Sequence, residues 1–169
     1  VEGIHACLRT VPNVTTGMDP DQVESTEEGA LFCSLNDLEK CSGLVLGSPT
    51  RFGNMAAPLK YFIDQSSTLW MNGSMIDKPA GVFTASSSLH GGQETTLISM
   101  MLPLLHHGMV ICGLPYSEPE LMQTTGGGTP YGPSHWAGHD GKHKISQPEK
   151  VMCQSLGKRI ARLAKAFVG

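Results

Sequence analysis

Two loops in the sequence combine hydroxyl, aromatic, cationic and glycine residues in a way that suits a planar ligand. The first spans residues 47–55 (GSPTRFGNM) and offers hydroxyls, a guanidinium, an aromatic ring and a flexible backbone at Gly53, just before a predicted helix. These groups fit a planar, hydrogen-bonding and partly anionic ring system. A plain surface turn with an exposed arginine would have the same composition.

The second loop spans residues 84–94 (TASSSLHGGQE). Its small hydroxyl residues and the pair Gly91-Gly92 allow backbone amides to approach a ligand closely. An isolated Gly/Ser-rich loop is a weak indicator. Both loops, however, follow predicted strands, and ligands of open parallel sheets bind at the carboxyl ends of the strands.

The elements that position these loops alternate between strand and helix, which predicts an α/β domain. Continuous apolar runs predict three strands buried on both faces, at 44–46, 80–84 and 109–112. Helical spacing of apolar residues predicts three helices, over 55–63, 93–107 and 146–167. The alternating run 4–11 predicts an edge or near-edge strand, and the polar stretch 15–28 a surface loop.

The predicted helices carry recognisable ends. Gly108 is placed to cap the helix 93–107, which is apolar nearly all round and should be buried on several sides, by the sheet and by another subunit. Ser146 and Glu149 form a capping box. The last helix should bury one face, consisting of Met152, Leu156, Ile160, Leu163 and Phe167.

Five short motifs occur in a fixed order along the chain. They are GSPTRFGNM at 47–55, LW at 69–70, GGQET at 91–95, HHGM at 106–109 and GGTPYG at 127–132. This set resembles the WrbA family of FMN-dependent NAD(P)H:quinone oxidoreductases over almost the whole chain. The resemblance implies one flavodoxin-like α/β domain over residues 1–169, a three-layer sandwich with a parallel five-stranded sheet of order 2-1-3-4-5.

The resemblance also implies which residues hold the cofactor FMN. Matched by position, one side of its isoalloxazine ring is lined by Thr50, Arg51, Phe52, Gly53 and Asn54. The opposite wall consists of Ser86, Ser87, Ser88, Leu89, His90 and Gly91. Trp70 flanks the quinone pocket, and His106 contacts the flavin and shapes the site or donates a proton. The second loop of the family is often shorter and glycine-rich, so Leu89 and His90 narrow the expected pocket.

Several of these residues have structural alternatives. Trp70 is also explained as core packing, although its loop-like neighbours favour a ligand-facing ring. Either of His106 and His107 is explained as a cap on helix carbonyls. Three histidines have the helical spacing of a metal site, namely His135, His139 and His143. Two glycines interrupt any helix there, so we expect no metal.

The composition excludes several classes of protein. The 169 residues include 12 Lys plus Arg and 15 Asp plus Glu, a net charge of −3 that provides no basic stripe for nucleic acid. The apolar runs are far shorter than the roughly 20 residues of a membrane span. The first residues lack the pattern of a secretory leader, so we expect a cytoplasmic protein. The five widely spaced cysteines predict reduced thiols and not disulfides or zinc ligands.

The beginning of the sequence does not match the start of a flavodoxin-like domain. Such a domain opens with a buried strand and a hydroxyl-rich loop that holds the FMN phosphate. Val1-Glu2-Gly3 resembles the tail of the helix that follows. Because loss of an interior strand would leave unpaired sheet edges, we expect the strand and the phosphate loop to precede Val1 in the intact protein.

The activity implied by the resemblance is a ping-pong reaction in a homotetramer (dimer of dimers) whose active sites form between subunits. NADH or NADPH reduces FMN and leaves, and a quinone then takes two electrons in the same pocket. One alternative is a flavodoxin-type electron carrier, which uses no nicotinamide and is usually strongly acidic. Another is a non-catalytic interaction protein, whose docking surface could not be told from a tetramer interface.

Overall fold

The computed structural model describes residues 1–14 and 29–167, and the surface loop expected at 15–28 lies outside the described residues. The elements follow one another in this order: α1 (Leu35–Lys40), β1 (Leu44–Pro49), α2 (Ala57–Asp64), α3 (Ser67–Met71), β2 (Pro79–Ser86), α4 (Gln93–His106), β3 (Val110–Ile111), α5 (Glu120–Gln123), β4 (Ser134–Trp136) and α6 (Gln147–Phe167). The predicted α/β alternation is confirmed.

The strands form a parallel sheet with β2 at its centre. β1 pairs with one edge of β2 along its whole length, from Leu44 opposite Ala80 to Pro49 opposite Ala85. The other edge of β2 pairs with β3 at its first two residues and with β4 at its last three. β3 and β4 therefore act as one strand interrupted by residues 112–133. The described residues contain four strands, so the order 2-1-3-4-5 with five strands remains a prediction.

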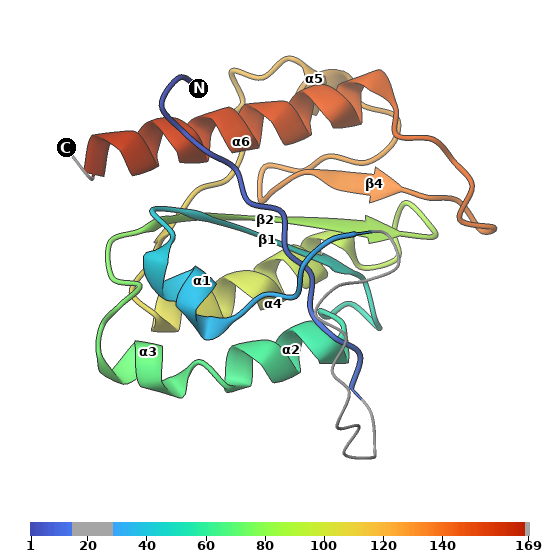
Figure 1. Ribbon diagram of the computed structural model, residues 1–169. Helices are drawn as coiled ribbons and strands as arrows, with labels where there is room; N and C mark the ends of the chain where they lie inside the picture. Colours follow the sequence, from blue (N-terminus) through green and yellow to red (C-terminus); the bar gives the residue numbers. More distant parts are fainter. Residues whose placement is uncertain (15–28, 168–169) are drawn as a thin grey trace.

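Helices cover both faces of the sheet. Figure 1 shows α6 and α5 on one face and α1 to α4 on the other. Leu156 of α6 lies so close to Gly81 of β2 that a Cβ on the glycine would be 2.9 Å from the leucine side chain. On the other face, Leu97, Met100 and Leu104 of α4 join the main hydrophobic core. Among the described residues, no helix is long and apolar enough to cross a membrane.

One expectation about a buried surface is wrong, and another is confirmed only for the side that the sheet covers. Phe167 is 52% exposed, and Ala164 takes the buried place at that end of α6. The helix α4 is covered by the sheet on one side, whereas Leu102 and Leu105 on its other side are exposed in the single chain. The cap predicted at Gly108 is confirmed, because this residue has φ 76° and its N–H donates to the carbonyl of Leu105 at 2.9 Å.

The strand expected at 4–11 is also wrong. Within residues 1–14, only Thr10 makes a β-bridge, to Phe32. The preceding backbone contacts helices instead, since Lys165 Nζ donates to Glu2 O at 3.3 Å and Arg9 forms an ion pair with Asp37 of α1. Alternation of apolar and polar residues makes a strand only where a neighbouring strand completes the hydrogen-bond ladder.

Candidate functional site

The first candidate loop, residues 50–54, is a tight turn at the carboxyl end of β1. Arg51 and Asn54 exchange two backbone hydrogen bonds of 2.8 and 3.0 Å, which places Phe52 and Gly53 at the corner. Both corner residues have positive φ, at 54° and 76°. This conformation costs a residue with a side chain about 1–2 kcal/mol. The Phe52 ring is nevertheless fully exposed, at 108% of its reference area, and backbone strain of this kind clusters at ligand contacts.

The two candidate loops are locked together by direct contacts. Thr50 Oγ1 lies 2.7 Å from Thr96 Oγ1 of α4, and Thr50 N donates to Ala85 O of β2 at 2.9 Å. Gly92, with φ 88°, packs on Gly53 so closely that a Cβ would lie 2.7 Å from the Cα of Gly53. A side chain at position 92 would therefore push the loops apart.

The second candidate loop, residues 86–91, is held by its carbonyl groups. Four of these accept hydrogen bonds: Ser86 O from Ala137 N at 2.8 Å, Ser87 O from Trp136 Nε1 at 3.1 Å, Ser88 O from the Ser86 hydroxyl at 2.7 Å and from Gly91 N at 3.2 Å, and Gly91 O from the Thr50 hydroxyl at 3.4 Å. The N–H groups of residues 87–90 have no partner among the described residues, and these four residues are exposed. They remain available to donate to a ligand.

A chain of buried polar side chains lies beneath the second loop. Gln93 Nε2 donates to Ser86 Oγ at 2.7 Å, and Gln93 Oε1 accepts from Ser134 Oγ at 2.6 Å. Ser134 Oγ in turn accepts from the Gly128 N–H at 2.7 Å. Each buried side chain has partners, so the network fixes the start of α4 against β2 and β4. No sequence feature pointed to this arrangement, although Gln93 belongs to the motif GGQET.

Glu149 connects the end of β4 with α6. Its carboxylate is 3% exposed and accepts hydrogen bonds from four donors: the backbone N–H groups of Ser146 at 2.7 Å, Trp136 at 2.9 Å and Gly127 at 3.0 Å, and His135 Nδ1 at 3.1 Å. Burial by itself would raise the pKa of this carboxyl, but the hydrogen bonds outweigh it and lower the pKa from 4.5 to about 2. The capping box predicted at Ser146 and Glu149 is confirmed, while no sequence feature pointed to the bond with Trp136.

His135 and His143 each contact other side chains or backbone groups of the protein. His135 bridges Glu149 and the carbonyl of His143, the latter at 3.1 Å. The His143 ring meets the Trp136 ring edge-on, with centroids 4.7 Å apart and planes at 83°. Across residues 1–14 and 29–167, no group of three His, Cys, Asp or Glu residues could hold a metal ion.

Trp70 and His106 lie at the opposite end of the sheet from the two loops. α4 begins next to the second loop and ends at His106, and its 14 residues make a helix about 20 Å long. Trp70 is 53% exposed on α3, which leads into the start of β2. One chain therefore brings residues 50–54 and 86–91 together, but neither Trp70 nor His106 joins them.

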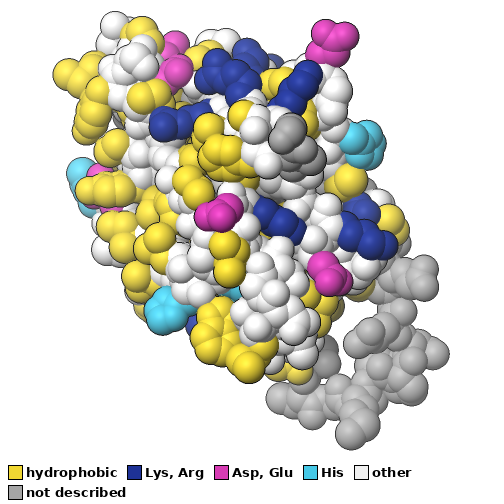
Figure 2. Space-filling model, turned by 90° about the vertical axis from the view of Figure 1, so that its left-hand side faces the viewer, with side chains coloured by type: hydrophobic (Ala, Val, Ile, Leu, Met, Phe, Trp, Pro, Cys, Tyr) yellow, Lys and Arg dark blue, Asp and Glu magenta, His cyan; other side chains and the backbone are white. Residues whose placement is uncertain are grey.

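The surface at this opposite end is apolar. Figure 2 looks onto this end and shows hydrophobic side chains gathered along one side of it. Exposed apolar residues from these elements include Met71, Ile76 and Leu105. Behind them, His107 Nε2 pairs with the Ser66 hydroxyl at 2.9 Å, and burial lowers the pKa of this histidine. A contiguous apolar patch is typical of a surface that contacts another protein.

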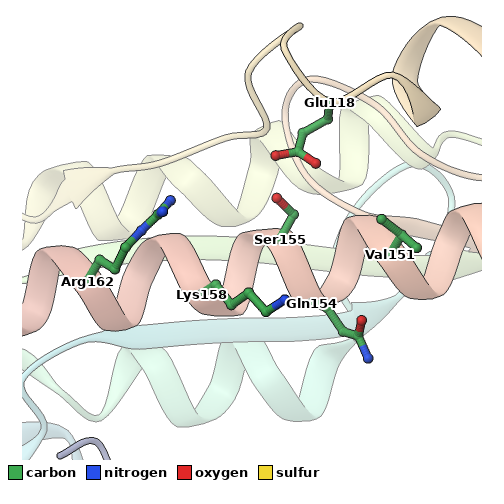
Figure 3. A pocket seen from close by; sticks show the side chains of 6 residues that line it. All are labelled: Glu118, Val151, Gln154, Ser155, Lys158 and Arg162. Atoms are coloured by element: carbon green, nitrogen blue, oxygen red, sulfur yellow. The ribbon is translucent and has the colours of Figure 1, made fainter. Parts of the chain in front are cut away.

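A hollow of about 280 Å³ lies away from both loops, on the outer face of α6 (Figure 3). It is lined by Glu118, Val151, Gln154, Ser155, Lys158 and Arg162. None of these residues belongs to a loop at the carboxyl ends of β1 and β2. The mixture of one carboxylate with two cations is typical of a solvated helix face.

The parallel sheet with helices on both faces is a flavodoxin-like fold, and the two interlocked loops form the candidate site at the carboxyl ends of β1 and β2. Residues 24–117 match the family model described as NADPH-dependent FMN reductase. The chain is 40% identical over 98% of its length to an NAD(P)H dehydrogenase (quinone) of Solidesulfovibrio magneticus, of which it covers 85%. A protein of the same name from Syntrophobacter fumaroxidans is 38% identical, with coverage of 98% and 84%.

Solved structures agree with these relatives. A flavodoxin, WrbA-like protein from Agrobacterium tumefaciens is 26% identical with a TM-score of 0.61, over 83% of this chain and 74% of that one. The chain therefore belongs to the NADPH-dependent FMN reductase family, and the predicted resemblance to WrbA proteins is confirmed. FMN is the cofactor of this family.

Because of the hydrogen bonds to Glu149, we expect the free energy of unfolding to vary with pH in the acid range. Because its folded pKa of about 2 is below 4.5, its contribution is present above about pH 4.5 and is lost as the pH falls towards 2. The difference between these two pKa values corresponds to a free energy of roughly 3 kcal/mol. We expect Glu149→Gln to be less stable at pH 7 by about that amount and to lose less stability between about pH 5 and pH 2, as measured by urea unfolding at several pH values. The exposed Glu39→Gln is the matched control, and equal pH profiles for wild type and Glu149→Gln would contradict the assignment.

Proposed function

We propose that this chain is an FMN-dependent NAD(P)H dehydrogenase (quinone), which reduces quinones to hydroquinones. The names of the relatives and the family model support the activity. The observation in the structure that supports it best is the pair of interlocked loops, with free amides and an exposed aromatic ring at the carboxyl ends of β1 and β2.

The groups on the two loops fit the isoalloxazine ring of FMN. That ring is planar, has oxygen and nitrogen acceptors along one edge, and gains negative charge on reduction. The amides of residues 87–90 provide donors, and the Phe52 ring provides an apolar face. Arg51 has no carboxylate partner among the described residues, so its guanidinium is available to offset the negative charge. We assign Thr50 to Asn54 and Ser86 to Gly91 to the binding of FMN.

The chain contributes binding, orientation and fixed dipoles to the reaction. When bound, FMN supplies the redox chemistry, by accepting a hydride from NADH or NADPH and passing two electrons to a quinone. The amides of the second loop are preorganised donors because the carbonyl bonds to Ala137 and Trp136 already fix the loop. The contact of Thr50 with Thr96 ties the first loop to α4, the helix that follows the second loop.

Trp70 and His106 enter this proposal through a second copy of the chain. They lie a helix length from the loops of their own chain, at an exposed apolar end. We propose a homotetramer in which this end covers the loops of a neighbouring subunit, with Trp70 beside the quinone and His106 near the flavin as a proton donor. A cytoplasmic location belongs to the same proposal and is supported by the unpaired cysteines.

The activity is tested with purified protein saturated with FMN. We expect NADPH or NADH to bleach the flavin absorption under anaerobic conditions, and benzoquinone to restore it, with turnover on the order of 1–1000 per second. An electron carrier of the flavodoxin type would hold FMN that NAD(P)H does not bleach. Failure of both nucleotides to reduce the bound flavin would rule out the proposed enzyme.

The shared active site is tested by mixing two inactive variants. In Gly53→Val the added side chain would clash with Thr95. The backbone at position 53 also has φ 76°, which residues with a side chain rarely adopt, so FMN binding should fail. His106→Ala removes the proposed proton donor at the opposite end of the chain, so activity should fall about a hundredfold or more. When the two single variants are expressed together, about a quarter of the active sites should be intact. Each site takes its two halves from different chains, so it can combine the unchanged half of one variant with the unchanged half of the other.

The controls are each variant expressed alone and wild type at matched subunit concentration. Mixed protein with no more activity than the separate variants would show that both halves of the site come from one chain.

A further inference from the structure

Trp136 fixes the orientation of one peptide group in the second loop. Its indole Nε1 donates to the carbonyl oxygen of Ser87 at 3.1 Å. In a trans peptide the C=O of one residue and the N–H of the next point in opposite directions. The bond to Trp136 therefore turns the N–H of Ser88 away from the indole.

The order of the strands places the second loop between β4 and the first loop. Trp136 ends β4, which pairs with one edge of β2, whereas the first loop follows β1 on the other edge. The second loop follows β2 and stands between them. Ser88 is exposed and its N–H has no partner among the described residues, so it is available to a ligand bound beside the first loop, where Phe52 is also exposed.

The neighbouring peptide groups are fixed by other means. Ser86 O accepts from the backbone of Ala137, and Ser88 O accepts from the Ser86 hydroxyl within the loop itself. Among the described residues, Trp136 is the one side chain outside the loop that binds a carbonyl of residues 86–88. Its position is fixed in turn by the bond from its backbone N–H to Glu149 Oε1 at 2.9 Å and by the edge contact of its ring with His143.

We propose that Trp136 is a positioning residue of the flavin site, which acts through the peptide between Ser87 and Ser88. Its indole N–H holds the carbonyl of Ser87, so that the N–H of Ser88 donates to an acceptor atom of the FMN ring. This inference rests on the proposed function. It assigns a role to an aromatic residue that none of the five sequence motifs includes.

Two matched variants separate the hydrogen bond from the packing of the ring. Trp136→Phe removes the indole N–H and keeps an aromatic ring against His143. His143→Leu keeps the indole N–H and removes the edge contact. FMN affinity is measured by titration of the full-length apoprotein with flavin fluorescence, and the melting temperature of each apoprotein reports folding.

We expect Trp136→Phe to bind FMN about three- to tenfold more weakly than wild type, the effect of losing one well-made hydrogen bond. His143→Leu should stay within about twofold of wild type. Amide hydrogen exchange gives a second readout that does not depend on activity. On addition of FMN, the exchange of the Ser88 amide should slow in wild type and should slow much less in Trp136→Phe.

The outcomes distinguish this inference from the proposed function. Unchanged FMN affinity and Ser88 protection in Trp136→Phe would overturn the role of Trp136, while FMN binding by wild type would still support the proposed function. An equal loss of affinity in His143→Leu would show that ring packing matters and not the N–H bond. A wild-type protein that binds no FMN would overturn both.

Discussion

The contact between the backbones of Gly53 and Gly92 joins the loops that follow β1 and β2, and the candidate site depends on it. β1 and β2 pair up to Pro49 opposite Ala85, one residue before the end of β2, so both loops leave the sheet at nearly the same level. Two residues without side chains then allow the loops to touch. With side chains at these positions the loops would separate, and the residues assigned to the site would no longer lie side by side.

The second loop is held from behind by hydrogen bonds that reach across the sheet. Its carbonyls accept hydrogen bonds from the end of β4, from Thr50 and from the loop itself, whereas the N–H groups of residues 87–90 have no partner among the described residues. Gln93 and Glu149 anchor this arrangement from two directions, one at the start of α4 and the other at the start of α6. Buried polar groups with complete partners favour one geometry over others. A site that must bind a rigid ring gains from such a fixed set of donors.

Much of the fold followed from local patterns in the sequence. Continuous apolar runs located β1, β2 and β3, and the glycine and capping-box patterns located the end of α4 and the start of α6. The strand predicted at 4–11 was wrong because alternation of apolar and polar residues indicates a half-buried segment but does not supply a neighbouring strand to pair with. The prediction that Phe167 is buried was wrong because the apolar face of α6 extends beyond the part of the helix that the core covers.

The candidate site could be foreseen only in part. The two loops carry distinctive compositions, but Trp136 and Gln93 act through partners 49 and 41 residues away, and no local pattern records such pairs. The roles of Trp70 and His106 depend on a second copy of the chain, since a helix length separates them from the loops. Titration of the apoprotein and of Gly92→Val with FMN tests the central claim most directly. We predict that wild type binds FMN and that Gly92→Val binds it at least tenfold more weakly while remaining folded. Equal affinities would contradict a flavin site built on the contact between the two loops.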